Sequence, residues 1–359
     1  MISIKNYVAR VAIPILLAAT ALGAQQTQPP IQPQGSPPAP ATQAPANPAD
    51  RQGTIVRNVD LVDVLFTVVT KHEKLVTDLN KENFKVFDDG VQQEVISFSQ
   101  PTELPIRMGM VLDTSNSVRS RLKFEQDAAI DFLFNALRPA QDQAFLMTFD
   151  DGAQLIKNFS PDPGELRDII LKQRAGGGTS LYDAIYEASE QLLNKSPLPP
   201  GPNPDVRRVL VVISDGDDNS SNRSRGAAVE MAQRAGVIIY AISSSTEWVD
   251  TSEQSDPSKR INRKYSMGEG DRVLQQLAEE TGGRAFFPYV IDDLGQSFLD
   301  IGNELRHQYA LEYSPAGRTP AGKYHTIRVQ VDRKDVIVRA RKGYFYIPTA
   351  TPSAPAPKP

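Results

Sequence analysis

Between residues 106 and 306, short apolar runs alternate with longer segments that carry apolar residues at helical spacing. The predicted strands are IRMGMVLD, QAFLMTFD, AQLIKNFS, RRVLVVIS, VIIYAISS and AFFPY. The predicted helices lie within SVRSRLKFEQDAAIDFLFNAL, LYDAIYEASEQLL, NRSRGAAVEMAQRAG, DRVLQQLAEETGG and LGQSFLDIGNELRHQ. Strands that alternate with helices form a mostly parallel sheet covered on both faces. We therefore predict a doubly wound α/β domain over residues 102–306.

The two segments that flank this region are predicted to be all β. Residues 54–101 contain VDLVDVLFTVV and FKVFDDGVQQEVISFS, in which apolar and polar residues alternate and Asp89-Gly90 supplies a hairpin turn. Residues 307–347 contain the strand-like runs HQYALEYSP, YHTIRVQVDR and DVIVRARKGYFYI. Each segment makes only a few strands, and a lone hairpin is marginal in water. We expect the segments to pair as one small discontinuous β domain, into which the α/β domain is inserted.

The N-terminus is typical of an export signal. Lys5 and Arg10 precede the apolar run VAIPILLAATALG, and Ala21 and Gly23 offer a cleavage site before Ala24. We predict a signal peptide over residues 1–23 and an exported protein, periplasmic or secreted. The alternative is an uncleaved anchor, which would be the only membrane attachment, although the run is shorter than the roughly 20 apolar residues of a membrane span.

Two further segments are predicted to be disordered. Residues 24–53 form a linker rich in Pro, Gln, Ala and Ser, and residues 348–359 repeat that composition in a tail. Such segments cannot bury enough apolar surface to offset the entropy of ordering.

Composition excludes several classes of function. The formal net charge is -4 and the basic residues are dispersed, so no nucleic-acid partner is expected. The chain has no cysteine, which rules out disulfides, thiolate nucleophiles and cysteine-bound zinc. Its histidines, His72, His307 and His325, do not form a metal-ligand pair in the sequence.

Oxygen-bearing side chains gather where predicted strands end. Asp113, Ser115 and Ser117 follow the first strand of the α/β region, and Asp215 follows RRVLVVIS. Thr179 lies in the glycine-rich stretch GGGTSLYDAI that opens a helix. The loops converge if these strands are neighbours, and hard oxygen donors suit Mg²⁺. We predict a divalent-cation site for Mg²⁺, with Mn²⁺ or Ca²⁺ as alternatives.

Each of these residues also has an ordinary structural explanation. Asp and Ser are good helix N-caps, Asp215 suits a turn before Gly216, and Ser180 with Asp183 resembles a capping box. We assign Asp183 to that cap and not to the metal. Three independent caps need not fall at adjoining strand ends, so the combination favours a metal site.

The combination of D-x-S-x-S, G-G-T and S-D-G resembles the metal-ion-dependent adhesion site (MIDAS) of the von Willebrand factor type A (VWFA) domain. The resemblance extends from about Ile106 to about Arg306, and NFKVFDDG and RKGYF resemble a bacterial family of exported proteins related to that domain. It implies a Rossmann-like fold in which the serines and the threonine bind metal through hydroxyls and the aspartates often act through water. The implied metal residues are Asp113, Ser115, Ser117, Thr179 and Asp215.

Neutral hydroxyl ligands would leave the cation electrophilic, so an Asp or Glu carboxylate of a partner protein could complete its coordination. We therefore expect an adhesion or scaffold module that binds protein, and not an enzyme. One alternative is an envelope component whose metal is purely stabilising. Another is a Mg²⁺-dependent hydrolase or phosphatase, but Ser115 stands where an aspartate-nucleophile phosphatase needs a second acid, and no histidine lies in these loops.

Overall fold

The computed structural model describes residues 61–100, 104–200, 205–245, 267–288, 291–316 and 320–346, with only the backbone for residues 291–297. The predicted signal peptide, the Pro-rich linker, residues 54–60 of the first β segment and the whole predicted tail lie outside these residues. The domain boundaries given above therefore stay predictions.

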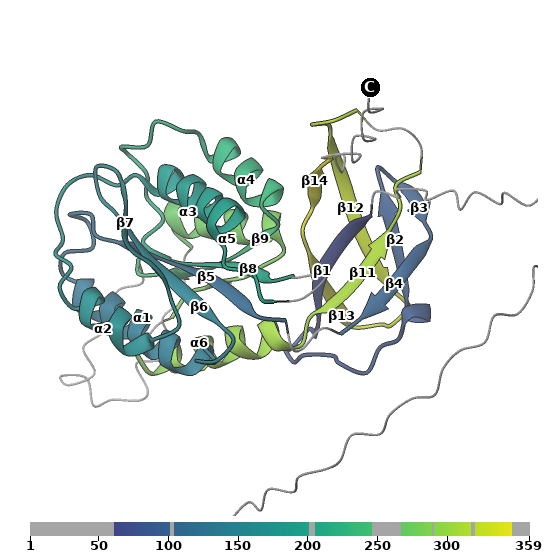
Figure 1. Ribbon diagram of the computed structural model, residues 1–359, viewed down its shortest axis with the longest axis horizontal. Helices are drawn as coiled ribbons and strands as arrows, with labels where there is room; N and C mark the ends of the chain where they lie inside the picture. Colours follow the sequence, from purple (N-terminus) through teal and green to yellow (C-terminus); the bar gives the residue numbers. More distant parts are fainter. Residues whose placement is uncertain are drawn as a thin grey trace, which may run out of the picture. The chain divides into compact units, whose positions relative to one another are not determined.

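A six-stranded sheet with the order β10-β9-β8-β5-β6-β7 forms the centre of the α/β region (Figure 1). The strands in chain order are β5 (Ile106–Asp113), β6 (Gln143–Phe149), β7 (Ala153–Ser160), β8 (Arg207–Ser214), β9 (Val237–Ser243) and β10 (Ala285–Phe286). All neighbours pair in parallel except β6 and β7, which form an antiparallel hairpin at one edge. Asp150, Asp151 and Gly152 form the turn of this hairpin, since Phe149 pairs with Ala153.

Helices cover both faces of this sheet, as predicted (Figure 1). One face packs against α1 (Leu122–Ala136), α2 (Pro163–Ile170) and α6 (Ile291–Arg306). The other packs against α3 (Leu181–Lys195), α4 (Arg225–Arg234) and α5 (Glu269–Thr281). The strands are buried on both faces, which explains why they read as continuous apolar runs.

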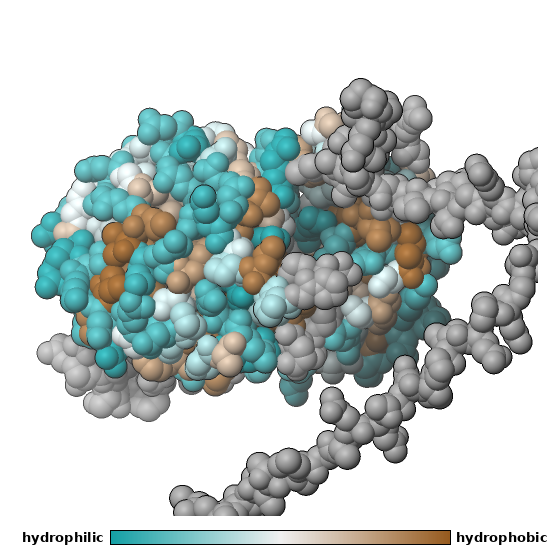
Figure 2. Space-filling model, viewed as in Figure 1, coloured by the Kyte–Doolittle hydropathy of each residue, from teal (hydrophilic) through white to brown (hydrophobic). Residues whose placement is uncertain are grey.

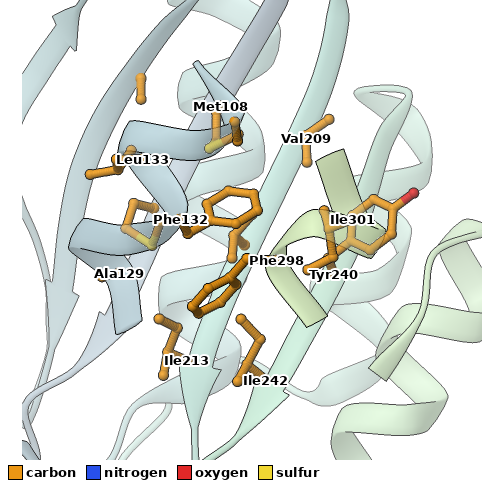
Figure 3. Close-up of a cluster of buried hydrophobic side chains, with 14 of the residues drawn as sticks. Met108, Ala129, Phe132, Leu133, Val209, Ile213, Tyr240, Ile242, Phe298 and Ile301 are labelled. Carbon is orange, nitrogen blue, oxygen red and sulfur yellow. The ribbon is translucent and has the colours of Figure 1, made fainter. Parts of the chain in front are cut away.

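The core under α1 and α6 shows how the sheet holds its helices (Figure 3). Phe132 of α1 and Phe298 of α6 meet edge to face with ring centroids 5.3 Å apart. They pack over Met108, Val209 and other apolar side chains that point from the strands to this face (Figure 3). This packing holds α1 against the sheet, and α1 is the helix that follows the loop after β5.

The β region consists of two antiparallel sheets around one shared core. One has the order β13-β1-β11-β4 and the other β14-β12-β2-β3. The strands are β1 (Val62–Thr70), β2 (Phe84–Asp88), β3 (Val91–Gln93), β4 (Val95–Ser99), β11 (Tyr309–Tyr313), β12 (Tyr324–Val331), β13 (Val336–Ala340) and β14 (Gly343–Phe345). A short 3-10 helix, η2 (Lys81–Asn83), precedes β2.

Strands from the two ends of the chain pair with each other in both sheets. In the registers, Val64 of β1 lies opposite Leu311 of β11, and Val86 of β2 lies opposite Val329 of β12. Three strands of the first segment, β1, β2 and β4, thus find partners beyond the α/β region. The predicted fold class, a mostly parallel α/β sheet with added small antiparallel β structure, is confirmed.

On the face shown in Figure 2, hydrophilic residues cover most of the described surface, and hydrophobic residues form separate patches. Among the described residues, no helix has the length and apolar character needed to cross a membrane.

Candidate metal centre

The candidate site begins where β5 and β8 end side by side. Leu112 is in register with Ile213, so Asp113, the last residue of β5, comes next to Ser214, the last residue of β8. The Ser214 hydroxyl donates a hydrogen bond to Asp113 Oδ2 at 2.7 Å. Because parallel strands end at the same edge, Asp113 and Asp215 are brought to one place by topology.

The loop after β5 folds back on its own aspartate. The backbone N–H of Ser115 donates to Asp113 Oδ1 at 2.8 Å, and the hydroxyls of Ser115 and Ser117 lie 2.9 Å apart. Asp113 and Ser115 are completely buried, whereas Ser117 is exposed. The paired hydroxyls therefore stand at the border between the protein interior and solvent.

The glycine-rich loop before α3 is bonded to the β5 loop through the backbone. The N–H of Gly176 donates to the Thr114 carbonyl, and the N–H of Asn116 donates to the Gly177 carbonyl, at 2.8 and 3.2 Å. Gly177 has a φ of +77°, and a Cβ on Gly178 would lie 2.0 Å from the Ser220 hydroxyl oxygen. Glycine is required at both positions for this close approach.

Thr179 follows at the end of that loop and is tied to the segment after β8. Its N–H donates to Asn219 Oδ1 at 2.9 Å, and its carbonyl accepts from the N–H groups of Asn219 and Ser220. Thr179 and Asp215 are both buried. The structure thus joins the three predicted loops by hydrogen bonds, whereas coordination of one ion by the five side chains is proposed below.

The two hydroxyl oxygens after β5 have a spacing suited to Mg²⁺. Adjacent ligands of an octahedral Mg²⁺ with bonds of 2.0–2.1 Å lie about 2.9 Å apart. The hydroxyl oxygens of Ser115 and Ser117 have this separation. The spacing of these two oxygens is therefore compatible with adjacent positions around a hard divalent cation.

Negative charge accumulates around these loops. Burial raises the pKa of Asp113 to about 6 and the nearby Asp215 raises it further, although hydrogen bonds from Ser214 and Ser115 oppose the rise. Burial, Asp215 and Glu269 also raise the pKa of Asp217. Carboxylates that disfavour one another's charge in this way are stabilised by a cation placed among them.

Asp183 and Asp218 have structural roles that the sequence did not disclose. Ser180 makes no side-chain capping bond, so the expected capping box with Asp183 is wrong. Asp218 caps α3 instead, accepting from the N–H of Tyr182 at 3.0 Å. Asp183 accepts from the N–H groups of Asn222 and Arg223, 39 and 40 residues away, a contact that no local pattern predicts.

Another group of potential ligands lies in the β region, where Asp88, Asp89 and His325 come together. Asp88 is buried and accepts from the hydroxyls of Tyr313 and Tyr344 at 2.9 and 2.8 Å, and His325 Nδ1 lies 2.8 Å from its other oxygen. These contacts occupy both carboxylate oxygens of Asp88. We interpret the group as a polar network that holds β2, β11, β12 and β14 together.

Comparison with solved structures finds similar folds at low sequence identity. An aerotolerance-related membrane protein from Bacteroides fragilis is 18% identical over 56% of this chain and 98% of its own, with a TM-score of 0.42. Proximal thread matrix protein 1 from the mussel byssus, with a zinc-occupied MIDAS motif, is 16% identical over 62% of this chain and 50% of its own, with a TM-score of 0.42. A von Willebrand factor type A protein from Catenulispora acidiphila is 10% identical over 81% and 75%, with a TM-score of 0.41.

At these scores the likenesses carry no argument about function. A search of curated proteins found no match. The family model described as von Willebrand factor type A domain matches residues 108–217, the segment that holds the loops after β5, before α3 and after β8.

Proposed function

We propose that this chain is an exported, metal-dependent protein-binding module in which a MIDAS-bound divalent cation, Mg²⁺ in the first instance, accepts a carboxylate from a partner protein. The observation that carries the proposal is the hydrogen-bonded convergence of three loops that bear oxygen donors at one edge of the sheet. The match of residues 108–217 to the VWA family model supports it.

The five predicted residues would divide the work by their chemistry. The hydroxyls of Ser115, Ser117 and Thr179 would hold the ion directly, and Asp113 and Asp215 would act through its waters. When bound, the ion supplies an electrophilic coordination position. Because the direct ligands are neutral, that position suits an Asp or Glu side chain of a partner, and the surrounding loops would supply specificity.

Binding is a better reading of this site than catalysis. A serine nucleophile needs a neighbouring base. His72 follows β1, His307 follows α6 and His325 lies in β12, so the three histidines are outside the loops of the site.

Titration of the full chain with Mg²⁺ by calorimetry tests the metal site. We expect saturable binding that is lost in Asp113→Ala and retained in Asp131→Ala, a control that removes an exposed aspartate from α1. A wild-type chain that takes up neither Mg²⁺ nor Mn²⁺ would sink the proposal.

Capture of protein from an envelope fraction tests the role of the ion. Immobilised wild type should retain a partner in Mg²⁺ and release it in chelator, and Asp113→Ala should retain none. If chelator lowers the melting temperature but leaves capture intact, the metal is structural, as in the alternative of a stabilised envelope component.

A further inference from the structure

Glu125 is a buried acid that the fold alone does not explain. It lies in the first turn of α1 and is completely buried. Neither carboxyl oxygen has a partner in good hydrogen-bond geometry among the residues that the structure describes. An unpaired buried carboxyl group is costly, so its presence requires a partner of some kind.

The next residue of this helix, Gln126, is a buried polar side chain whose hydrogen bonds are made within the fold. Gln126 is also buried, and its amide donates to the carbonyls of Ile170 and Gln173 at 2.9 and 3.2 Å. The carboxyl oxygens of Glu125 make no comparable hydrogen bond to the backbone of a neighbouring element among the described residues.

The groups around Glu125 belong to the strand ends of the candidate metal centre. Burial raises its pKa well above the usual value, and the charges of Asp113 and Asp215 raise it further. Ser244, which follows β9, lies beside it, and its hydroxyl opposes this rise, although that hydroxyl is likewise buried without a partner of good hydrogen-bond geometry among the described residues. Arg121, which opposes the shift, donates to the Ser244 carbonyl.

We propose that Glu125 is a further acidic residue of the cation site, which acts on the bound ion from the α1 side through its waters and positions Asp113 and Asp215. The inference rests on the proposed function, because it requires an ion at the three loops. Mg²⁺ keeps several waters in protein sites, and a buried carboxylate is a strong acceptor for one of them. Glu125 is thus a positioning residue and not a direct ligand.

Glu125→Gln in the full chain tests this role, because the amide keeps the shape and removes the charge. Partners of this kind typically change metal affinity by 10–100-fold, so the Kd for Mg²⁺ should rise roughly tenfold or more in calorimetry. The melting temperature in chelator should stay the same or rise, since the repulsion from Asp113 and Asp215 is removed. The further rise in melting temperature on adding Mg²⁺ should shrink.

Two further variants separate positioning from simple packing. Glu125→Asp, which keeps the carboxylate, should bind Mg²⁺ more tightly than Glu125→Gln. Gln126→Leu, which removes a buried amide of the same helix without changing charge, should lower the melting temperature in chelator and weaken Mg²⁺ binding less than Glu125→Gln does.

The outcomes distinguish this inference from the proposed function. Wild-type affinity in Glu125→Gln overturns the role of Glu125 and leaves the cation site standing. Unfolding of Glu125→Gln in chelator also overturns it, because that result would show a purely structural side chain. Absence of Mg²⁺ binding in the wild type instead removes the proposed function itself.

Discussion

The aspartates near the carboxyl edge of the sheet differ in how many hydrogen bonds from the protein their carboxylate oxygens accept. The Asp183 carboxylate is occupied by the backbone of Asn222 and Arg223, and Asp218 by the start of α3. Asp215 accepts only a 3.2 Å bond from the N–H of Asp217 among the bonds resolved within the described residues. Asp183 and Asp218 are therefore committed to the fold, whereas Asp215 keeps acceptor capacity for an ion and its waters.

The committed role of Asp183 predicts a stability that depends on pH. Burial favours the neutral form of Asp183, but hydrogen bonds from Asn222 and Arg223 outweigh it and hold its pKa below the usual value. A depressed pKa means that its contribution is complete above the unfolded value, near 4, and is lost as pH falls through the folded value. We expect Asp183→Asn to cost about 2 kcal/mol at pH 7, as hydrogen bonds to charged groups do.

Urea unfolding of wild type and Asp183→Asn at pH 7 and pH 3 measures this dependence. The difference in the free energy of unfolding should narrow at pH 3. A difference that stays constant between the two pH values would contradict a charge-assisted role for Asp183.

At the scale of elements, the strands were predictable and the helix ends were not. Strands that are buried on both faces are mostly apolar along their length, so IRMGMVLD and RRVLVVIS could be recognised as strands from the sequence. The first helix lies within the predicted segment 117–137 but begins only at Leu122, because the preceding residues are drawn into turns beside the glycine-rich loop. The short α2 was missed, although Asp162 as N-cap and Pro163 are a local start signal.

The sequence also predicted where the loops of the site lie better than it predicted which side chains contact one another there. The strand ends could be placed because parallel strands share an edge. The role of Glu125 was missed, since a glutamate in the first turn of a helix is normally read as exposed and favourable to the helix dipole. Only its burial beside Asp113 and Asp215 singles it out.

The junction of β8 with α5 depends on a close main-chain contact between two glycines, Gly216 and Gly270. Gly216 has a φ of +83°, and a Cβ there would lie 2.2 Å from the Gly270 carbonyl oxygen in the first turn of α5. Gly216→Ala therefore meets both backbone strain and a clash with main chain, which together should cost about 3 kcal/mol. Because Asp215 precedes it, we also expect weaker Mg²⁺ binding in calorimetry.

Gly236→Ala is the matched control for this substitution. Gly236 has a φ of +62°, but no atom lies within 4 Å of the position of an added Cβ. It should carry the strain alone, about 1 kcal/mol in urea unfolding, and leave Mg²⁺ binding intact. Equal losses of stability in the two variants would show that the contact with Gly270 does not matter.

For the whole molecule, the main consequence of the topology is that its β region is assembled from both sides of the α/β insertion. β1 lies between β11 and β13, and β2 lies between β12 and β3. The shared core combines Phe66 and Phe84 of the first segment with Tyr309 of the second, in ring contacts of 5.0 to 5.5 Å between centroids. The two α/β cores, in contrast, are built from buried residues between 106 and 305.

Removal of residues 307–359 should therefore unfold one region and spare the other. Without β11, β12 and β13, the strands β1 and β4 lose their strand neighbours and β2 keeps only β3, so what remains of the first segment is too small to fold in water. Limited proteolysis should then cut rapidly within residues 61–100 and leave a resistant fragment that contains residues 104–306. Removal of residues 348–359 alone, which takes away no described strand, should leave the wild-type cleavage pattern. Protection of residues 61–100 in the longer truncation would mean that the first segment folds independently, and the discontinuous domain would have to be abandoned.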